Sequence, residues 1–137
     1  MQAGSNSFFV TSGVISASKD ITVSSDRRMK NSIDYDMDRY ESFFRALAPC
    51  RFRYNHEENQ QFHLGYIAQD VKAALDRCGL KENDFAGFTI GVKTGLSSFD
   101  DEMGLGYSEF ISLNTHMIQK LLQRVEMLEA TIQSMKS

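Results

Sequence analysis

The amino-acid sequence predicts an α+β fold, in which a small globular domain with a β-hairpin and short helices precedes one long C-terminal helix. Three observations support this prediction. Apolar residues recur at helical spacing between residues 38 and 48, and they alternate with polar ones on both sides of a polar turn between residues 50 and 66. From residue 111 to residue 135 they follow an unbroken heptad pattern. A length of 137 residues suits one domain with an appendage.

The first predicted helix begins near Asp38 and ends before Pro49. Asp38 and Glu41 have the spacing of a capping box, and Pro49 cannot continue a helix. The apolar stripe of this helix faces the core rather than a ligand, and it consists of Tyr40, Phe43, Phe44 and Leu47.

The middle of the chain predicts a hairpin, a second helix and a further strand. Residues 50–54 and 62–66 alternate in polarity around the polar turn NHEENQQ, which predicts two paired strands. The stretch from Ile67 to Gly79 predicts a short helix with Gly79 as its C′ residue. Residues 88–92 have strand character, whereas residues 96–107 have the composition of a loop.

The N-terminal leader, residues 1–24, is rich in serine, threonine and small residues. Short runs of β-forming residues occur at 7–13 and at 20–25. The leader is therefore interpreted as the end of a β-structured stalk or as a flexible arm.

The C-terminal heptads predict a helix of about 28 residues, which extends ~40 Å. So small a domain cannot cover a helix of that length, so its apolar seam is expected to pair with copies of itself rather than to pack inside its own domain. β-branched a positions with leucine at d favour two strands, whereas Met117 at g and Leu122 at e widen the stripe and favour more. The seam consists of Ile111, Ile118, Val125 and Ile132 at a, and of Asn114, Leu121, Leu128 and Met135 at d.

The composition limits which partners and cofactors are expected. A net charge of −3 gives no electrostatic reason to expect nucleic acid or an anionic membrane. No stretch approaches the roughly 20 apolar residues of a membrane span. Cys50 and Cys78 lack metal-ligand spacing and the three histidines are scattered, so no metal or other cofactor is expected.

The stretch SSDRRMK, residues 24–30, places serines close to a lysine. A serine hydroxyl is a weak nucleophile until a base removes its proton. A lysine can act as that base only when neutral, a state that burial and nearby positive charges such as Arg27 and Arg28 favour. The same residues also fit a solvated turn with helix-capping serines.

Spacing limits how Ser25 and Lys30 could meet. A regular strand separates them by ~16 Å, and a helix turns them about 140° apart. The pair therefore requires a turn, or a lysine from another subunit. Our hypothesis from the sequence is that it closes only in an assembled oligomer.

In this order, the serine–lysine stretch, the hairpin, the segment HLGYIAQDV and the terminal heptads resemble a known family. It is the intramolecular chaperone domain at the C-terminus of bacteriophage tail spikes, tail fibres and endosialidases, the peptidase S74 type, which also occurs in the eukaryotic myelin regulatory factor. The resemblance covers residue 24 to the end of the chain. Its marks are Ser25, Asp26, Arg28, Lys30 and Ile33, then LAPCRFRY (47–54), His63, Gly65, residues 67–71 and residues 107–122.

The resemblance implies a homotrimer that helps an upstream fibre or spike segment, its client, to fold and then releases itself by autoproteolysis between Ser24 and Ser25. Ser25 is the implied nucleophile and Lys30 its base, acting through an N-to-O acyl shift or by direct hydrolytic attack. Residues 1–24 would be the end of the client, 25–107 the chaperone and autoprotease domain, and 108–137 the coiled coil. The implied location is a phage virion tail made in the host cytoplasm, from which the domain is released after cleavage.

Three further residues are candidates for a supporting role beside this dyad. His63, Gln69 and Asp70 could orient the dyad or donate hydrogen bonds to an oxyanion. The alternative is a histidine half-packed on aromatic rings and the polar start of a helix. For the whole chain, the alternative is a non-catalytic trimerisation or attachment module at the tip of a fibre.

Overall fold

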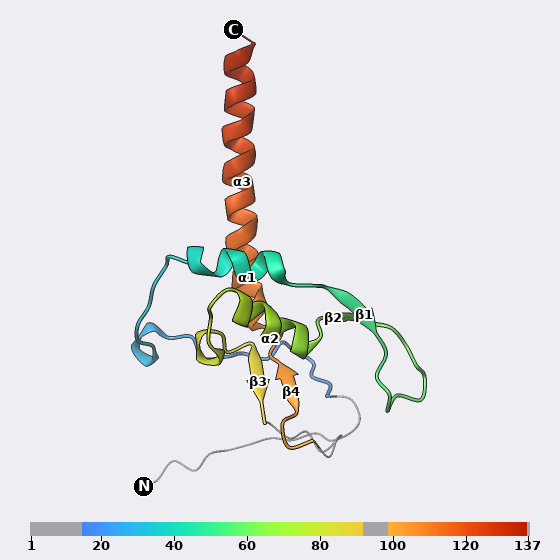
Figure 1. Ribbon diagram of the computed structural model, residues 1–137. Coiled ribbons are helices and arrows are strands. Elements are labelled where there is room, and N and C mark those ends of the chain that lie inside the picture. Colours follow the sequence, from blue (N-terminus) through green and yellow to red (C-terminus); the bar gives the residue numbers. More distant parts are fainter. Residues whose placement is uncertain (1–14, 92–98, 137) are drawn as a thin grey trace.

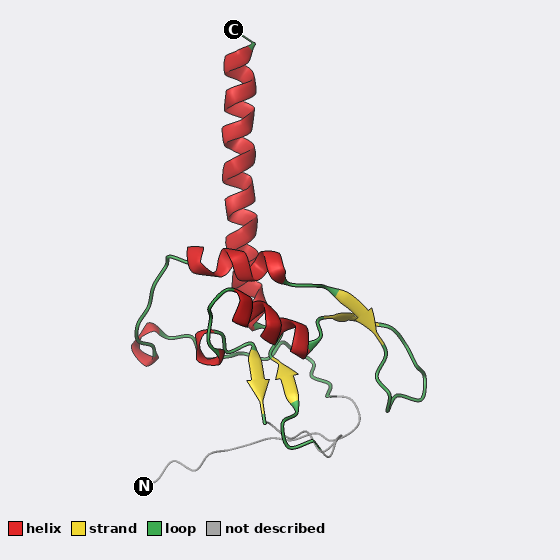
Figure 2. Ribbon diagram, in the orientation of Figure 1, coloured by secondary structure: helices red, strands yellow, loops and turns green. Residues whose placement is uncertain are grey.

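The computed structural model of the protein describes residues 15–91 and 99–136. It shows a small body of short helices and hairpins from which one long helix projects, as Figure 1 shows. The elements are η1 (Arg27–Met29), η2 (Asp38–Tyr40), α1 (Glu41–Ala46), β1 (Cys50–Phe52), β2 (His63–Gly65), α2 (Ala68–Arg77), η3 (Glu82–Asp84), β3 (Phe88–Ile90), β4 (Met103–Leu105) and α3 (Glu109–Met135). The strands form two separate antiparallel hairpins, drawn as yellow arrows in Figure 2. The predicted α+β class is confirmed.

The core lies where α1, α2, the β3–β4 hairpin and the first turns of α3 meet. Phe43 of α1 is fully buried, and its ring packs edge-on against Phe85 at 5.1 Å between centroids. Phe110 of α3 packs on the same Phe85 ring at 5.0 Å. These aromatic contacts join three segments that are distant in sequence, and burial of their apolar surface is the main stabilising term. The other buried apolar residues are Val71, Ala74, Leu75, Leu80, Phe88, Leu113 and Met117.

The first helix is confirmed, but its predicted capping box is wrong. Asp38 lies in η2, and α1 begins at Glu41 with Tyr40 as an N-cap that makes no side-chain capping bond. The carboxylates of Asp38 and Glu41 instead face Lys120 of α3. A tertiary ion pair has displaced the local cap.

The first hairpin and the second helix are also confirmed. Cys50 pairs with Gly65 and Phe52 with His63 in the β1–β2 register. Helix α2 ends in a Schellman motif, because the N–H of Gly79 donates to the carbonyl of Asp76 and that of Leu80 to the carbonyl of Leu75. Gly79 has φ +71°, which explains the glycine at this position.

One segment with the composition of a loop contains a strand. Residues 103–105 form β4, which pairs with β3 in the register Thr89 to Gly104. A Cβ atom on Gly104 would lie 2.9 Å from Oγ1 of Thr89, so the glycine makes room for its cross-strand neighbour. Glycine in a strand weakens the sequence signal, so the composition of residues 96–107 indicates a loop although a strand lies within it. Val92, at the end of the predicted strand, lies outside the described residues.

Two faces of helix α3 differ in burial. Phe110, Leu113 and Met117 are buried against the body. The seam residues lie on another face and are exposed in the single chain, so this seam does not pack inside its own domain. They are Ile111, Asn114, Ile118, Leu121, Val125, Leu128, Ile132 and Met135. The long helix is thus confirmed, and its pairing in a coiled coil stays a prediction.

The segment from residue 15 to residue 36 lies outside the core, and none of its residues is buried. The β-forming run at 20–25 makes no strand, and the run at 7–13 falls outside the described residues. Within the described part of the chain, no helix has the length and hydropathy needed to cross a membrane.

Candidate functional site

A tight turn at residues 25–30 is the feature on which the candidate site depends. Asp26 is the N-cap of η1, and its Oδ1 accepts a hydrogen bond from the backbone N–H of Arg28 at 2.9 Å. The N–H of Met29 donates to the carbonyl of Asp26, and that of Lys30 donates to the carbonyl of Arg27. These bonds reverse the direction of the chain within five residues, so that Ser25 and Lys30 lie on the same side of the turn.

Ser25 and Lys30 meet across this turn. Lys30 Nζ lies 2.6 Å from Ser25 Oγ, a short hydrogen bond. The neighbouring Ser24 is directed elsewhere, since its hydroxyl contacts Sδ of Met29 at 3.2 Å. The turn therefore associates the amine with the second serine of the doublet. The contact is made within one chain, so the expectation that the pair closes only in an oligomer is wrong.

The pair lies in water in the single chain. Ser25, Lys30 and every residue between them are exposed. Proximity is thus supplied by the turn, but the water exclusion that favours a neutral amine is not.

The two arginines of the turn have separate partners. Arg28 forms a bidentate ion pair with Asp26, with an NH2–Oδ2 distance of 2.8 Å and an Nε–Oδ1 distance of 3.0 Å. The hydrogen bonds from Arg28 hold the pKa of Asp26 below its ordinary value of 3.8, and Asp26 raises the pKa of Arg28. Arg27 donates to the Tyr35 hydroxyl at 2.8 Å. Arg28 is therefore not the uncompensated positive charge that the sequence suggested.

Replacing Arg28 with alanine is expected to raise the pKa of Asp26 toward 3.8, because the carboxylate loses its main hydrogen-bond donor. A carboxyl group with a lowered folded-state pKa stabilises the turn above pH 3.8, and this contribution is lost as the pH falls through the lowered value. An NMR titration of the Asp26 carboxyl measures this pKa in the unaltered protein and in the Arg28→Ala variant. Arg27→Ala is the matched control and should leave this pKa unchanged. Equal Asp26 titrations in the two variants would contradict the assignment.

His63 belongs to the first hairpin, in a partly buried aromatic cluster. Its Nε2 lies 2.7 Å from Oε1 of Glu57, but the two groups are not aligned as a hydrogen bond. The rings of Phe52 and Tyr54 pack against the imidazole at 5.8 and 5.0 Å. Burial raises the pKa of the Tyr54 hydroxyl, and electrostatic interactions with Tyr107 and Glu57 raise it further.

Gln69 and Asp70 are exposed residues in the first turn of α2. In the described part of the chain, no hydrogen bond or ion pair joins His63, Gln69 or Asp70 to Ser25 or Lys30. Their supporting role stays a prediction, because no contact within the described single chain joins them to the dyad.

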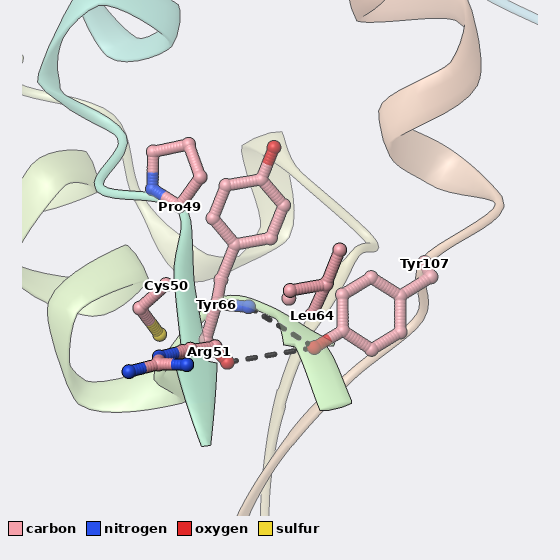
Figure 3. Close-up of a pocket in the computed structure, with 7 residues that line it drawn as sticks. Pro49, Cys50, Arg51, Leu64, Tyr66 and Tyr107 are labelled. Carbon is pink, nitrogen blue, oxygen red and sulfur yellow. Dashed lines mark hydrogen bonds between the residues drawn. The ribbon is translucent and has the colours of Figure 1, made fainter. Parts of the chain in front are cut away.

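A shallow pocket lies beside the first hairpin and is apart from the dyad. Figure 3 shows Tyr107 reaching across it, with its hydroxyl 3.2 Å from the backbone N of Tyr66. A Cβ atom on Gly65 would collide with that hydroxyl, so the glycine permits the contact. Neither Ser25 nor Lys30 lines this pocket, and its walls are largely apolar. The lining residues are Pro49, Cys50, Arg51, Leu64, Gly65, Tyr66 and Tyr107.

A network of charges fixes the base of α3, and the sequence reading missed it. Ligand atoms of Asp38, Glu41 and His116 lie within 4.8 Å of one another. Lys120 Nζ lies 3.0 Å from Oδ1 of Asp38 and 3.5 Å from Oε1 of Glu41, so an ammonium already neutralises these carboxylates. Lys120 lowers the pKa of Asp38, and Asp38 raises that of Lys120. The network is a structural ion-pair cluster, and spacing alone could not reveal it because its members lie about 80 residues apart.

Comparison with known proteins agrees with this architecture. Residues 25–80 match the Peptidase S74 family model, described as chaperone of endosialidase. A crystal structure of "a novel intramolecular chaperon" has the same fold, with a TM-score of 0.55 and 18% identity over 73% of this chain and 99% of that chain. No curated protein matches the chain. The matched segment begins at Ser25, and the resemblance drawn from the sequence to the intramolecular chaperone domain is confirmed.

Proposed function

We propose that this chain, whose residues 25–80 match the family model described as chaperone of endosialidase, is a self-cleaving intramolecular chaperone. It assembles as a homotrimer through α3 and assists the folding of a fibre or spike segment upstream. It then releases itself by cleaving the bond between Ser24 and Ser25. In this proposal the chain is part of a bacteriophage tail made in the host cytoplasm.

The observation that carries the proposal is the 2.6 Å contact between Lys30 Nζ and Ser25 Oγ. A nucleophile within hydrogen-bond reach of a base is the geometric requirement for nucleophilic catalysis. This contact occurs at the first residue of the segment that matches the family.

The reaction assigned to this pair begins with proton transfer from Ser25 Oγ to a neutral Lys30 amine. The oxygen attacks the carbonyl carbon of Ser24, and the C–N bond to Ser25 breaks as the leaving nitrogen takes the proton back from Lys30. The resulting ester is hydrolysed by water, which leaves a carboxylate on Ser24 and restores the Ser25 hydroxyl. No cofactor enters this sequence, because serine and lysine supply the nucleophile and the proton transfer.

In this proposal, assembly excludes the water that surrounds the dyad in the single chain. The apolar seam of α3 and the dyad are both exposed in one copy. In the proposed trimer, seam pairing sets three copies side by side, and burial at their contacts removes water from the dyad. Three chains held in register would also lower the entropic cost of starting an interwoven stalk in the client.

The mass of the purified chain tests cleavage directly. We expect a fragment comprising residues 25–137, and no such fragment from Ser25→Ala or Lys30→Ala, because each removes one partner of the contact. Ser24→Ala is the matched control and should still be cleaved, since Ser24 Oγ points to Met29. An intact chain at every pH, or cleavage that survives Lys30→Ala, would refute the catalytic assignment.

The exposure of both dyad side chains favours a second candidate, a non-catalytic trimerisation or attachment module at the tip of a fibre. It predicts the same oligomer without cleavage. An intact oligomer whose assembly is indifferent to Ser25→Ala would support this candidate.

A further inference from the structure

The outer face of the first hairpin is basic and apolar, and its residues are exposed in the part of the chain that the structure describes. Arg51 and Arg53 project from this face, and both guanidinium groups lie over the ring of Phe62, at 4.3 and 4.0 Å from its centroid. Leu64 is cross-strand from Arg51 and is 84% exposed. Within the described residues, neither arginine has a carboxylate at ion-pair distance. We define these four residues as the basic face.

Contact with Phe62 leaves the basic face able to bind carboxylates. An aromatic ring accepts no N–H···O hydrogen bond from a guanidinium group that lies over it, so the N–H groups remain available for a bidentate contact with a carboxylate. The phenyl ring also restricts the arginine rotamers, so little conformational entropy remains to be lost on binding. Such a surface suits a partner that alternates acidic and apolar side chains.

The chain itself contains such a segment, between η1 and η2. Residues 33–37 read IDYDM, with Asp34 and Asp36 alternating with Ile33, Tyr35 and Met37. The two aspartates are exposed, and within the described residues their only partners are backbone N–H groups of Asp36 and Asp38. Tyr35 is 79% exposed. We define residues 33–37 as the acidic segment.

The two surfaces match in charge and in the sequence spacing of their charged residues. Arg51 and Arg53 are two residues apart on one strand, which places their Cα atoms about 6.5 Å apart. Asp34 and Asp36 are also two residues apart, and each retains a carboxylate oxygen that is free of the local hydrogen bonds. The apolar pocket beside Arg51 and Leu64 could take the Tyr35 ring.

The two surfaces lie on either side of the long helix within one copy. In Figure 1 the β1–β2 hairpin extends to one side of α3, and the chain between η1 and η2 runs on the other. In a ring of copies around an axis parallel to α3, each copy presents one of its sides to the opposite side of its neighbour. Such a heterologous contact would bring the basic face of one copy to the acidic segment of the next.

We propose that the basic face of one copy binds the acidic segment of a neighbouring copy, with Arg51 and Arg53 paired to Asp34 and Asp36. This inference rests on the self-association in the proposed function and identifies the lateral contact that accompanies the α3 seam. The acidic segment begins three residues after Lys30. The contact therefore holds the turn of one copy against the hairpin of another, and it covers a segment that is exposed in the single chain.

Charge reversal tests the contact. The double variant R51E/R53E and the double variant D34K/D36K should each raise the protein concentration for half-assembly by about tenfold or more, because like charges then face one another. The variant that carries all four changes restores opposite charges at every interface and should recover most of the loss. Sedimentation velocity at two salt concentrations measures this, and high salt should weaken the unaltered protein most. R45E/R77E is the matched control, with the same change in net charge at exposed helical positions, and should assemble normally.

A cross-link identifies which copy is bound. In a C50S/C78S background, the pair D36C and R53C should oxidise to chains linked between copies, which run as covalent oligomers under denaturing conditions. An intrachain disulfide, or four charge changes that rescue nothing, would overturn the inference. If the charge variants assemble as the unaltered chain does, the lateral contact is refuted while self-association through α3 stands. A chain that stays monomeric at all concentrations overturns both.

Discussion

Replacing Phe43 with alanine is expected to lower the free energy of unfolding by about 3–5 kcal/mol, because a fully buried ring is removed from the centre of the core. Phe43 packs against Phe85, which also contacts Phe110 of α3. The cavity would therefore lie where the body and the long helix join. For a chain of this size the loss corresponds to a fall in melting temperature of about 10–17 °C.

Thermal and urea unfolding followed by circular dichroism measure this change. The matched control is Met127→Ala, which truncates a large apolar side chain of α3 that is 69% exposed and lies outside the seam, and it should change stability by about 0.5 kcal/mol or less. A Phe43→Ala protein as stable as this control would mean that the core has been placed wrongly.

Aspartates at Val125 and Leu128 are expected to keep the chain monomeric. Both side chains lie in the α3 seam, and they are 48% and 60% exposed in the single chain. The body and the helix should therefore fold as before, whereas any seam pairing would bury several unpaired carboxylates, at a cost far above the gain from apolar contact. We expect the dissociation constant of the oligomer to rise by at least about a hundredfold.

Sedimentation equilibrium and the far-ultraviolet circular dichroism spectrum separate these effects. The double variant Q123D/A130D is the control, since it introduces the same two charges on the opposite face of the helix and should leave assembly intact. Under the proposed function, cleavage falls together with assembly, because the dyad loses the burial that neighbouring copies provide. Full-rate cleavage by a chain shown to be monomeric would instead mean that the exposed pair is sufficient by itself.

Local sequence patterns predicted the elements that depend on local physics. The alternation around residues 55–61 gave the first hairpin, and Gly79 marked the end of α2 because only a residue tolerant of positive φ suits a Schellman motif. The heptads predicted α3 because one exposed apolar stripe repeats over its whole length. The strand at 103–105 was missed because its glycine is explained only by Thr89 on the partner strand.

In the candidate site, too, some features follow from the local sequence and others depend on the folded structure. Spacing showed that Ser25 and Lys30 could not meet in a regular strand or helix, and the structure supplies the turn that brings them together. Asp26 as N-cap is a local signal that could have predicted this turn from the sequence. That Arg28 would be neutralised by Asp26 depends on side-chain geometry, which residue spacing does not specify.

By itself, the sequence determined most of the helices, which stripe of α3 is apolar, and that Ser25 and Lys30 need a turn between them in order to meet within one chain. These properties follow from periodicity and capping, which act within a few residues. Only the tertiary structure decided that Phe110, Leu113 and Met117 dock on the body while the seam stays exposed, and that Asp38 and Glu41 pair with Lys120. Such choices are made between segments far apart in the chain, where packing and ion pairing override local preference.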